Sequence, residues 1–184
     1  MIFARSDRLL LRRAREEDLD ALSPGWSDPE MTRFTGVRPD PRGFLRQMIA
    51  DMLVKEPGES EPGGPWYQYI VERAADGAVV GDLGAGFGVP GEHQVELGYR
   101  ILPACQRQGY AREAVAALID HLAAEHGVHR FVAIAAEANA ASRAVVEALG
   151  FRQEGSFRQS FLCNGEWLDD AYYALLADEW RARR

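Results

Sequence analysis

Three segments with strand character in the middle of the chain set the first limit on its fold. They cover residues 66–72, 79–87 and 94–101, and the turn signals Asp76-Gly77 and 89–92 separate them. Short turns of this kind join neighbouring antiparallel strands, whereas parallel strands need a long crossover. The segments therefore predict an antiparallel meander.

The rest of the second half predicts helices packed on that sheet. Helices are expected over 110–124 and 140–149, because apolar residues recur there at helical spacing, and a short apolar strand over 130–135 lies between them. The chain then predicts a hairpin with strands over 151–162 and 167–176 and Asn164-Gly165 as its turn. A meander, a crossover helix and a closing hairpin predict an α/β fold, a mixed sheet flanked by helices.

The first half predicts one strand and two helices. Residues 8–13 form an apolar strand candidate, and Glu16, Glu17 and Asp18 suit the positive end of a helix that begins there. A second helix is expected over 39–55, where apolar side chains recur every three or four residues. The Gly- and Pro-rich segment 56–65 predicts an exposed loop inside one domain that covers residues 1–184.

Charge and composition limit the classes of partner that the chain can bind. The chain has 21 basic and 28 acidic residues, a net charge of −7, so phosphate backbones and anionic membranes would repel it. We expect neither nucleic acid nor a membrane as a partner. Lys55 is the single lysine, so any positive patch consists of arginine, whose planar guanidinium suits phosphate oxygens.

Cysteine and histidine usage predicts a cytoplasmic protein without a metal. Cys105 and Cys163 have neither CxxC nor metal-ligand spacing, which fits a reducing compartment without excluding a disulfide between them. No apolar run reaches the roughly 18 residues of a membrane span, and residues 1–20 are too charged for a signal peptide. His121, His126 and His129 lack the spacing of a zinc pair, and surface or capping roles are expected for them.

Segment 106–111, with the sequence Gln-Arg-Gln-Gly-Tyr-Ala, lies between a predicted strand and a long helix and can bind an anion. Gly109 permits close approach to the backbone, and the free N–H groups of the first helical turn lie at the positive end of the helix dipole. Arg107 and Arg112 flank the segment and could pair with phosphate oxygens. An ordinary tight strand-to-helix connection explains the same residues, and the segment matches neither Walker A nor GxGxxG.

Two other groups of residues leave alternatives open. Gly81, Gly84, Gly86 and Gly88 are followed by no helix, which excludes a dinucleotide fingerprint and predicts a bulge or a close backbone contact. The aromatic residues Trp26, Phe34 and those in 66–69 either shape a ligand pocket or belong to the core.

Several short motifs carry a resemblance to a known family. They are Glu96-Leu-Gly-Tyr99, Pro103, Gln106–Ala111, Asn139-Ala-Ala-Ser142 and Leu149-Gly-Phe151. Together they resemble the GNAT superfamily of acyl-CoA-dependent N-acetyltransferases, and the chain ends further resemble its Rim branch, which includes the ribosomal-protein alanine N-acetyltransferases. The resemblance implies a mixed, mostly antiparallel sheet whose fourth and fifth strands splay apart to admit pantetheine, with acetyl-CoA as the acyl donor.

The resemblance also implies how these positions would bind acetyl-CoA. The main chain of Tyr99, Arg100 and Ile101 would pair with the pantetheine amides. Asn139 would bond to pantetheine through its side chain, and Ser142 would lie near the sulfur; from the residues alone, they are equally a helix N-cap and a polar residue of the first turn. The pyrophosphate site would comprise Gln106, Arg107, Gln108, Gly109, Tyr110 and Ala111, with Arg112 and Arg143 nearby.

Transfer of an acyl group to an amine needs a proton acceptor and a way to release the thiolate. On an alternating strand Glu96 shares a face with Gly98 and Arg100, and we choose it as the general base, with a surface or salt-bridged glutamate as the alternative. Many family members have a tyrosine acid seven residues after the asparagine, but Val146 occupies that position here. The acid candidates are therefore Ser142 and Tyr173, although Tyr173 equally fits the core.

These observations predict an enzyme that transfers an acetyl group from acetyl-CoA to a primary amine by direct attack in a ternary complex. The expected acceptor is a protein or peptide N-terminal amine. A small amine, such as a polyamine, an aminoglycoside or an amino-acid derivative, is the alternative acceptor, and a non-catalytic acyl-CoA-binding module is the alternative function. A homodimer is compatible with the sequence.

Overall fold

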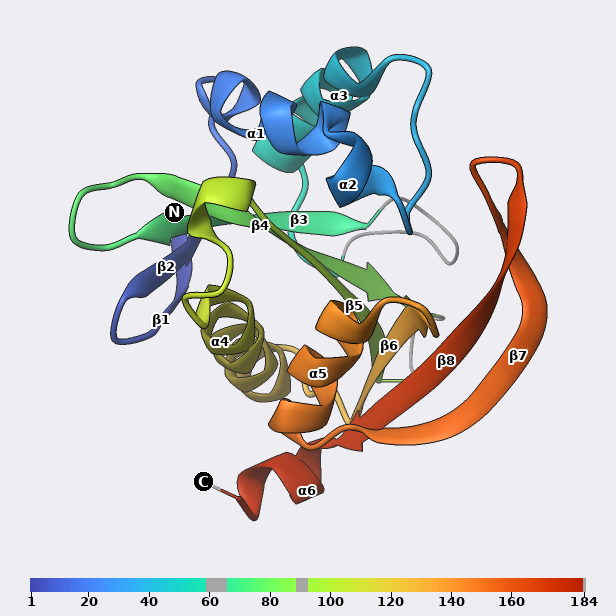
Figure 1. Cartoon of the computed structure of the whole chain (residues 1–184). Coiled ribbons are helices and arrows are strands. Elements are labelled where there is room, and N and C mark those ends of the chain that lie inside the picture. The colour runs from blue at the N-terminus through green and yellow to red at the C-terminus, as the bar shows by residue number, and fades with distance from the viewer. Residues whose placement is uncertain (59–65, 89–92, 184) are drawn as a thin grey trace.

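The computed structural model describes residues 1–58, 66–88 and 93–183, and its described strands form one mixed sheet (Figure 1). The strands lie in the order β1-β2-β3-β4-β5-β6-β8-β7. Only β5 and β6, among the described pairs, run parallel. The bounds are β1 (Ile2–Arg5), β2 (Leu9–Arg12), β3 (Tyr67–Arg73), β4 (Val79–Phe87), β5 (Gln94–Ile101), β6 (Arg130–Ala136), β7 (Arg152–Cys163) and β8 (Glu166–Leu176).

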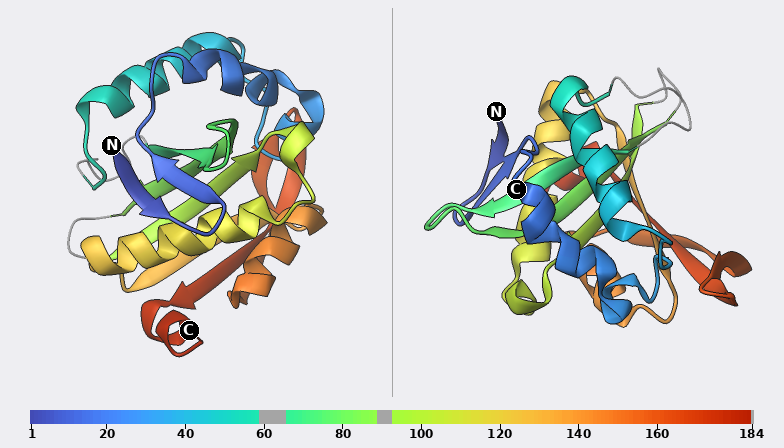
Figure 2. Two further views of the ribbon diagram at one scale, coloured as in Figure 1. Left: turned by 90° about the vertical axis from the view of Figure 1, so that its left-hand side faces the viewer. Right: turned by 90° about the horizontal axis from the view of Figure 1, so that it is seen from above.

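Helices cover both faces of this sheet (Figures 1 and 2). One face packs against α1 (Asp18–Ser27), α2 (Pro29–Thr32) and α3 (Pro41–Val54). The opposite face packs against α4 (Tyr110–Glu125) and α5 (Ala140–Leu149). The 3₁₀ turn η1 (Pro103–Cys105) leads from β5 toward α4, and α6 (Ala177–Arg181) follows β8.

The predicted mixed, mostly antiparallel sheet is confirmed, including the separation of two neighbouring strands. β5 and β6 are in register only at Gln94–Arg130, Val95–Phe131 and Glu96–Val132, so the rest of β5, from residue 97 to 101, has no partner on that side. The sequence did not predict β1. Because β1 adds one strand at the start, the strands that separate are the fifth and sixth of this chain rather than the fourth and fifth. Most of the predicted loop over 56–65 lies outside the described residues, and so does the whole of the predicted turn over 89–92.

A buried ion cluster joins β2, α1 and β3. Arg12 is 2% exposed, and its guanidinium donates to both carboxylate oxygens of Asp18 at 2.7 and 2.8 Å and to Glu72 at 2.5 Å. Asp18, which the sequence placed at a helix start for its charge, also accepts the backbone N–H of Arg15 at 2.7 Å. Removal of either acid would leave the Arg12 charge buried without a full set of partners, which is strongly destabilising.

An aromatic cluster between the sheet and α4 contains histidine in its interior. Phe3, Tyr69 and His121 lie in contact, with ring centroids 5.2 to 6.2 Å apart. Three buried polar atoms without a hydrogen-bond partner in the described part of the chain gather here: Tyr67 Oη, Tyr69 Oη and His121 Nε2. The surface role expected for His121 is therefore wrong, whereas His126 does cap α4 at its C-terminus.

The half-buried position of His121, with its Nε2 atom buried, predicts a pH-dependent stability. Burial and the neighbouring His126 lower the pKa of His121 below its ordinary value near 6.5. As pH falls below about 6.5, the unfolded chain takes up a proton that the folded chain resists, so the free energy of unfolding falls. His121→Phe removes this proton uptake. The free energy of unfolding, measured in urea between pH 7.5 and 5.5, should fall less for the variant than for the wild type. An equal fall in the two proteins would contradict a lowered pKa of His121.

Candidate functional site

The connection between β5 and α4 presents free backbone N–H groups at the start of a long helix. Gly109 is the N-cap residue of α4, its φ of 82° lies in the left-handed region, and no side chain caps the helix there. Arg107 adopts a left-handed φ of 60° as well. The first-turn N–H groups of a helix, with its dipole, attract anions. This backbone geometry is compatible with an anion cradle at 106–111, which stays a prediction.

An arginine far away in sequence supports this cradle. Arg8, next to β2, donates to the carbonyl of Gln108 at 3.1 Å and to Glu113 at 2.7 Å, and its guanidinium lies 4.6 Å from the centroid of the Tyr110 ring. Sequence reasoning missed Arg8, because nothing in the local pattern indicates a contact with residues about a hundred positions later. Arg107 and Arg112 are exposed and form no ion pair with any described residue, which leaves both guanidinium groups available to a ligand.

The edge of β5 that faces β6 offers unpaired backbone groups. The N–H of Leu102 donates to the Val80 carbonyl of β4 at 2.9 Å, and backbone groups alternate in direction along a strand. Those of Tyr99 and Ile101 therefore point away from β4, into the gap between β5 and β6. The Ile101 carbonyl accepts the side-chain amide of Gln106 at 3.0 Å. By the same alternation the backbone groups of Arg100, opposite Asp82, point toward β4, and its side chain lies 3.8 Å from the Trp26 ring on the other face. The predicted main-chain contact of Arg100 with pantetheine is therefore not supported.

Tyr99, Asn139 and Ser142 meet across this gap. The Tyr99 hydroxyl donates to the Ser142 carbonyl at 2.8 Å and also lies 2.8 Å from Ser142 Oγ. Asn139 caps α5, since its Oδ1 accepts the Ser142 N–H at 3.1 Å, and its Nδ2 has no partner in the described part of the chain. Burial raises the pKa of Tyr99 to about 12, so its hydroxyl stays protonated at neutral pH.

Glu96 lies on the other face of β5, the face covered by α1, α2 and α3. It is half-buried, and burial together with the nearby charge of Asp170 raises the pKa of its carboxyl. Asp170 of β8 is 8% exposed and accepts the Ser160 hydroxyl at 2.9 Å. A carboxylate with a raised pKa at the point where β5 and β6 part has the properties of a proton acceptor.

The other two predicted residues, Tyr173 and Arg143, bond to each other. Tyr173 is 1% exposed, accepts Arg143 Nε at 2.9 Å and donates to Glu147 at 2.8 Å. Burial raises the pKa of Tyr173, while Arg143 acts in the opposite direction. Arg143 also donates to the Glu137 carbonyl at 3.1 Å. The structure thus holds the Arg143 guanidinium against β8 and the loop before α5, whereas no described residue forms an ion pair with Arg107 or Arg112.

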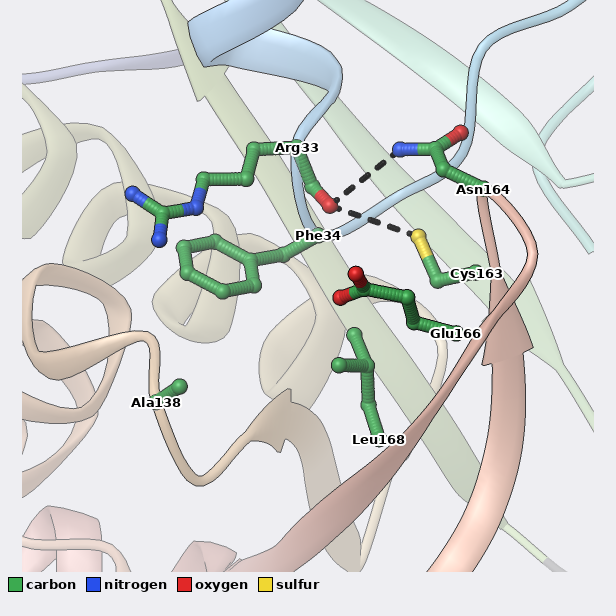
Figure 3. A pocket seen from close by; sticks show the side chains of 7 residues that line it. All are labelled: Arg33, Phe34, Ala138, Cys163, Asn164, Glu166 and Leu168. Carbon is green, nitrogen blue, oxygen red and sulfur yellow. Dashed lines mark hydrogen bonds between the residues drawn. The ribbon is translucent and has the colours of Figure 1, made fainter.

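A pocket of about 380 Å³ opens beside the N-terminus of α5 (Figure 3). Its walls come from the segment after α2, the β6–α5 connection and the tip of the β7–β8 hairpin, and its lining residues are Arg33, Phe34, Ala138, Cys163, Asn164, Glu166 and Leu168. Phe34, which the sequence offered as a pocket residue, lines it. Trp26 instead packs on Phe44 and donates to buried Asp82 at 3.2 Å.

Hydrogen bonds tie two walls of this pocket together. Cys163 Sγ and Asn164 Nδ2 both donate to the Arg33 carbonyl at 3.4 Å (Figure 3), and Asn164 Oδ1 accepts the Val37 N–H at 2.8 Å. The hairpin turn thereby fixes the segment after α2. In the described residues, no group of three or more His, Cys, Asp or Glu side chains could hold a metal ion, and no helix has the length and apolarity to cross a membrane.

Comparison with known proteins gives related sequences over nearly the whole chain. The family described as "Acetyltransferase (GNAT) domain" matches residues 8–152. An uncharacterized N-acetyltransferase of Bacillus subtilis, YnaD, is 30% identical over 174 residues, covering 94% of this chain and 96% of that protein. The ribosomal protein uS5-alanine N-acetyltransferase of Escherichia coli is 32% identical over 92 residues, covering 50% of this chain and 47% of that protein.

Solved structures agree with this relationship. A GNAT-family acetyltransferase from Bacillus anthracis superposes with a TM-score of 0.81 at 28% identity, covering 97% of this chain and all of that one. A ribosomal L7/L12 α-N-protein acetyltransferase, solved in complex with coenzyme A, has the same fold, with a TM-score of 0.78 at 24% identity over 97% of this chain and 99% of that one. The match to the domain over most of the chain, on a sheet that opens between β5 and β6, shows that this protein belongs to the GNAT family of acyl-CoA-dependent N-acetyltransferases.

Proposed function

We propose that this N-acetyltransferase transfers an acetyl group from acetyl-CoA to the N-terminal amine of a protein or peptide. The observation that carries the proposal is the gap between β5 and β6, which has an anion cradle on one face of the sheet and Glu96 on the other. Two substrates entering from opposite faces would meet in this gap. Direct attack in a ternary complex follows from that arrangement.

On the α4 and α5 face, the cofactor would bind along the open edge of β5. The backbone of Tyr99 and Ile101 would pair with the pantetheine amides, and Asn139 Nδ2 would donate to pantetheine. The pyrophosphate would accept the N–H groups of the cradle, comprising Gln106, Arg107, Gln108, Gly109, Tyr110 and Ala111. The free guanidinium groups of Arg107 and Arg112 support this site, and cofactor-binding roles for Arg143 and Ser142 stay predictions.

On the opposite face, the acceptor would occupy the pocket at Phe34 and Leu168. Ala138 lines this pocket and directly precedes Asn139, so the pocket adjoins the proposed thioester site. A volume of about 380 Å³ is near the lower end of ligand pockets and fits a chain end or a small amine. The Glu166 carboxylate at its wall would attract the positive charge of an amine.

The proposed reaction needs modest help from the protein. The neutral amine nitrogen attacks the thioester carbon, the carbon–sulfur bond breaks, and the amine proton passes to Glu96 through water. A peptide α-amine titrates near roughly 7.7 to 8.0, so a weak base suffices. The main-chain N–H of Tyr99 would stabilise the developing oxyanion. Ser142 and Tyr173 stay the candidates for assisting the departing thiolate; Ser142 is next to the Tyr99 hydroxyl, whereas Tyr173 bonds to Arg143 and Glu147.

Partial matches to a ribosomal-protein alanine N-acetyltransferase favour a protein N-terminus as the acceptor. The limited pocket volume favours the second candidate, a small-molecule amine.

We further propose that the protein acts in the cytoplasm, where acetyl-CoA and reduced cysteines coexist. A homodimer stays a prediction, and exposed Phe157, Phe161, Leu162 and Trp167 on the β7–β8 hairpin are consistent with it.

An acceptor panel tests the proposed function. The protein is incubated with acetyl-CoA and either a peptide with N-terminal alanine, the same peptide with a blocked N-terminus, or spermidine, and thiol release is followed. Release with the free peptide and not with the blocked one is expected. Release with spermidine alone would favour the small-amine alternative, and coenzyme A binding without release on any acceptor would favour a non-catalytic module.

Glu96→Gln tests the proposed base. The amide keeps the size of the side chain but takes up no proton, so kcat should fall by about 10²-fold, the lower end for a general base, because an α-amine needs little help. The dissociation constant for coenzyme A should be unchanged, since Glu96 lies on the opposite face of β5. Full turnover in the variant would exclude Glu96 as the base.

Gly109→Ala tests the proposed pyrophosphate cradle against a matched glycine. Gly77, in the β3–β4 turn, has a φ of 73° and no atom within 4 Å of an added Cβ, and Gly109 has a φ of 82°. Alanine at either position costs about 1–2 kcal/mol of stability from the left-handed backbone. Only Gly109→Ala should also weaken coenzyme A binding in calorimetry. Equal coenzyme A affinity in the two variants would place the phosphates elsewhere.

A further inference from the structure

Three glycines on the acceptor face make room for the indole of Trp66. A Cβ on Gly84 would lie 2.7 Å from the Trp66 ring, one on Gly86 would lie 2.8 Å from it, and one on Gly98 would also lie 2.8 Å from it. Real Cβ atoms do not approach other atoms so closely. The indole therefore lies across β4 and β5, directly against the backbone, where any other residue type would displace it. For Gly84 and Gly86, two members of the glycine cluster, the structure shows a close contact rather than the alternative of a bulge.

The three glycines under the indole lower the stability of the folded sheet. A glycine in the middle of a strand costs about 0.5–1 kcal/mol relative to alanine, because it loses more conformational freedom on folding. Two strands carry such glycines at the positions under one ring, Gly84 and Gly86 on β4 and Gly98 on β5. Trp66 is half-buried, so part of this residue is exposed to solvent.

Register places this indole next to Glu96. Gly86 is the cross-strand partner of Glu96, and Gly98 is two residues further along β5 on the same face. Opposite residues of an antiparallel pair have Cβ positions about 4.5–5.5 Å apart. The ring that covers Gly86 and Gly98 is therefore a direct neighbour of the proposed base, on the face that the acceptor would use.

We propose that Trp66 forms a second part of the acceptor site, outside the lining of the pocket at Phe34 and Leu168, and that its indole selects cationic amines. The inference rests on the proposed function, because it assigns the acceptor to the face of Glu96. An alkylammonium group is attracted to the face of an indole more strongly than to other aromatic rings, and the adjacent carboxylate adds to the attraction. The acceptor would dock against Trp66 in its cationic form and release one proton through Glu96 to solvent before it enters the gap as the neutral amine.

Kinetics of two variants test this role. Trp66→Ala removes the ring, and Gly86→Ala keeps the ring but displaces it, since the three atoms nearest to an added Cβ all belong to Trp66. Both should raise the KM for the alanine peptide by about 2- to 30-fold, the range of a lost cation–π contact, and leave the KM for acetyl-CoA unchanged. Unchanged peptide KM in both variants would overturn the proposal.

Gly155→Ala is the matched control. A Cβ on Gly155, on β7, would lie 2.8 Å from the Phe157 ring, so this variant displaces an aromatic ring with equal force on the β7–β8 hairpin. It should leave both KM values at the wild-type level. An equal rise of the peptide KM in Gly155→Ala and Gly86→Ala would show a general packing effect and overturn the proposal.

A binding measurement separates failure of this inference from failure of the proposed function. n-Butylammonium chloride is titrated into the protein saturated with coenzyme A, and tryptophan emission is followed. We expect a saturable change that n-pentanol, an uncharged molecule of similar shape, does not cause and that Trp66→Phe abolishes. Such a change supports the ammonium site even when no peptide is acetylated. No saturable change, or an equal one with pentanol, overturns it.

Discussion

The loss of pairing between β5 and β6 is the constraint on which the rest of the site depends. The two strands share three residue pairs, after which β6 continues beside β8 to Ala136 and β5 continues beside β4 alone. The start of α5 lies across the gap, and the bond from Tyr99 to Ser142 spans it. Because backbone groups of β5 that point into the gap need partners, this edge is suited to a ligand that supplies amide groups. Each role proposed for a side chain depends on where that side chain lies relative to this gap.

Sequence patterns predicted the elements that carry strong periodicity and clear boundaries. The bounds of β4, β5 and α5 agree with the expected ranges, because turn signals, Asn139 and Gly150 delimit them. β1, α2 and α6 were missed because four or five residues are too few to show a period.

Contacts across the fold explain what the sequence could not predict about the site. The cradle, Glu96 and Asn139 could be placed, because each depends on local backbone or on alternation along a strand. Arg8 could not, since its bond to Glu113 joins residues 105 positions apart. The glycine cluster predicted a close contact, but only the fold shows that Trp66 makes it. The charge of the two side chains did not predict that Arg107 is exposed whereas Arg143 donates a hydrogen bond to Tyr173.

The bonds from Cys163 and Asn164 to the segment after α2 have a consequence for how such a fold can change over time. They make one pocket wall from two surface segments that contribute nothing to the anion cradle or to the open edge of β5. Substitutions in the hairpin turn or in residues 33–37 can therefore reshape the pocket while the opposite face stays intact. If the pocket takes the acceptor as proposed, descendants of one ancestral chain can acquire new acceptors and still hold the same donor.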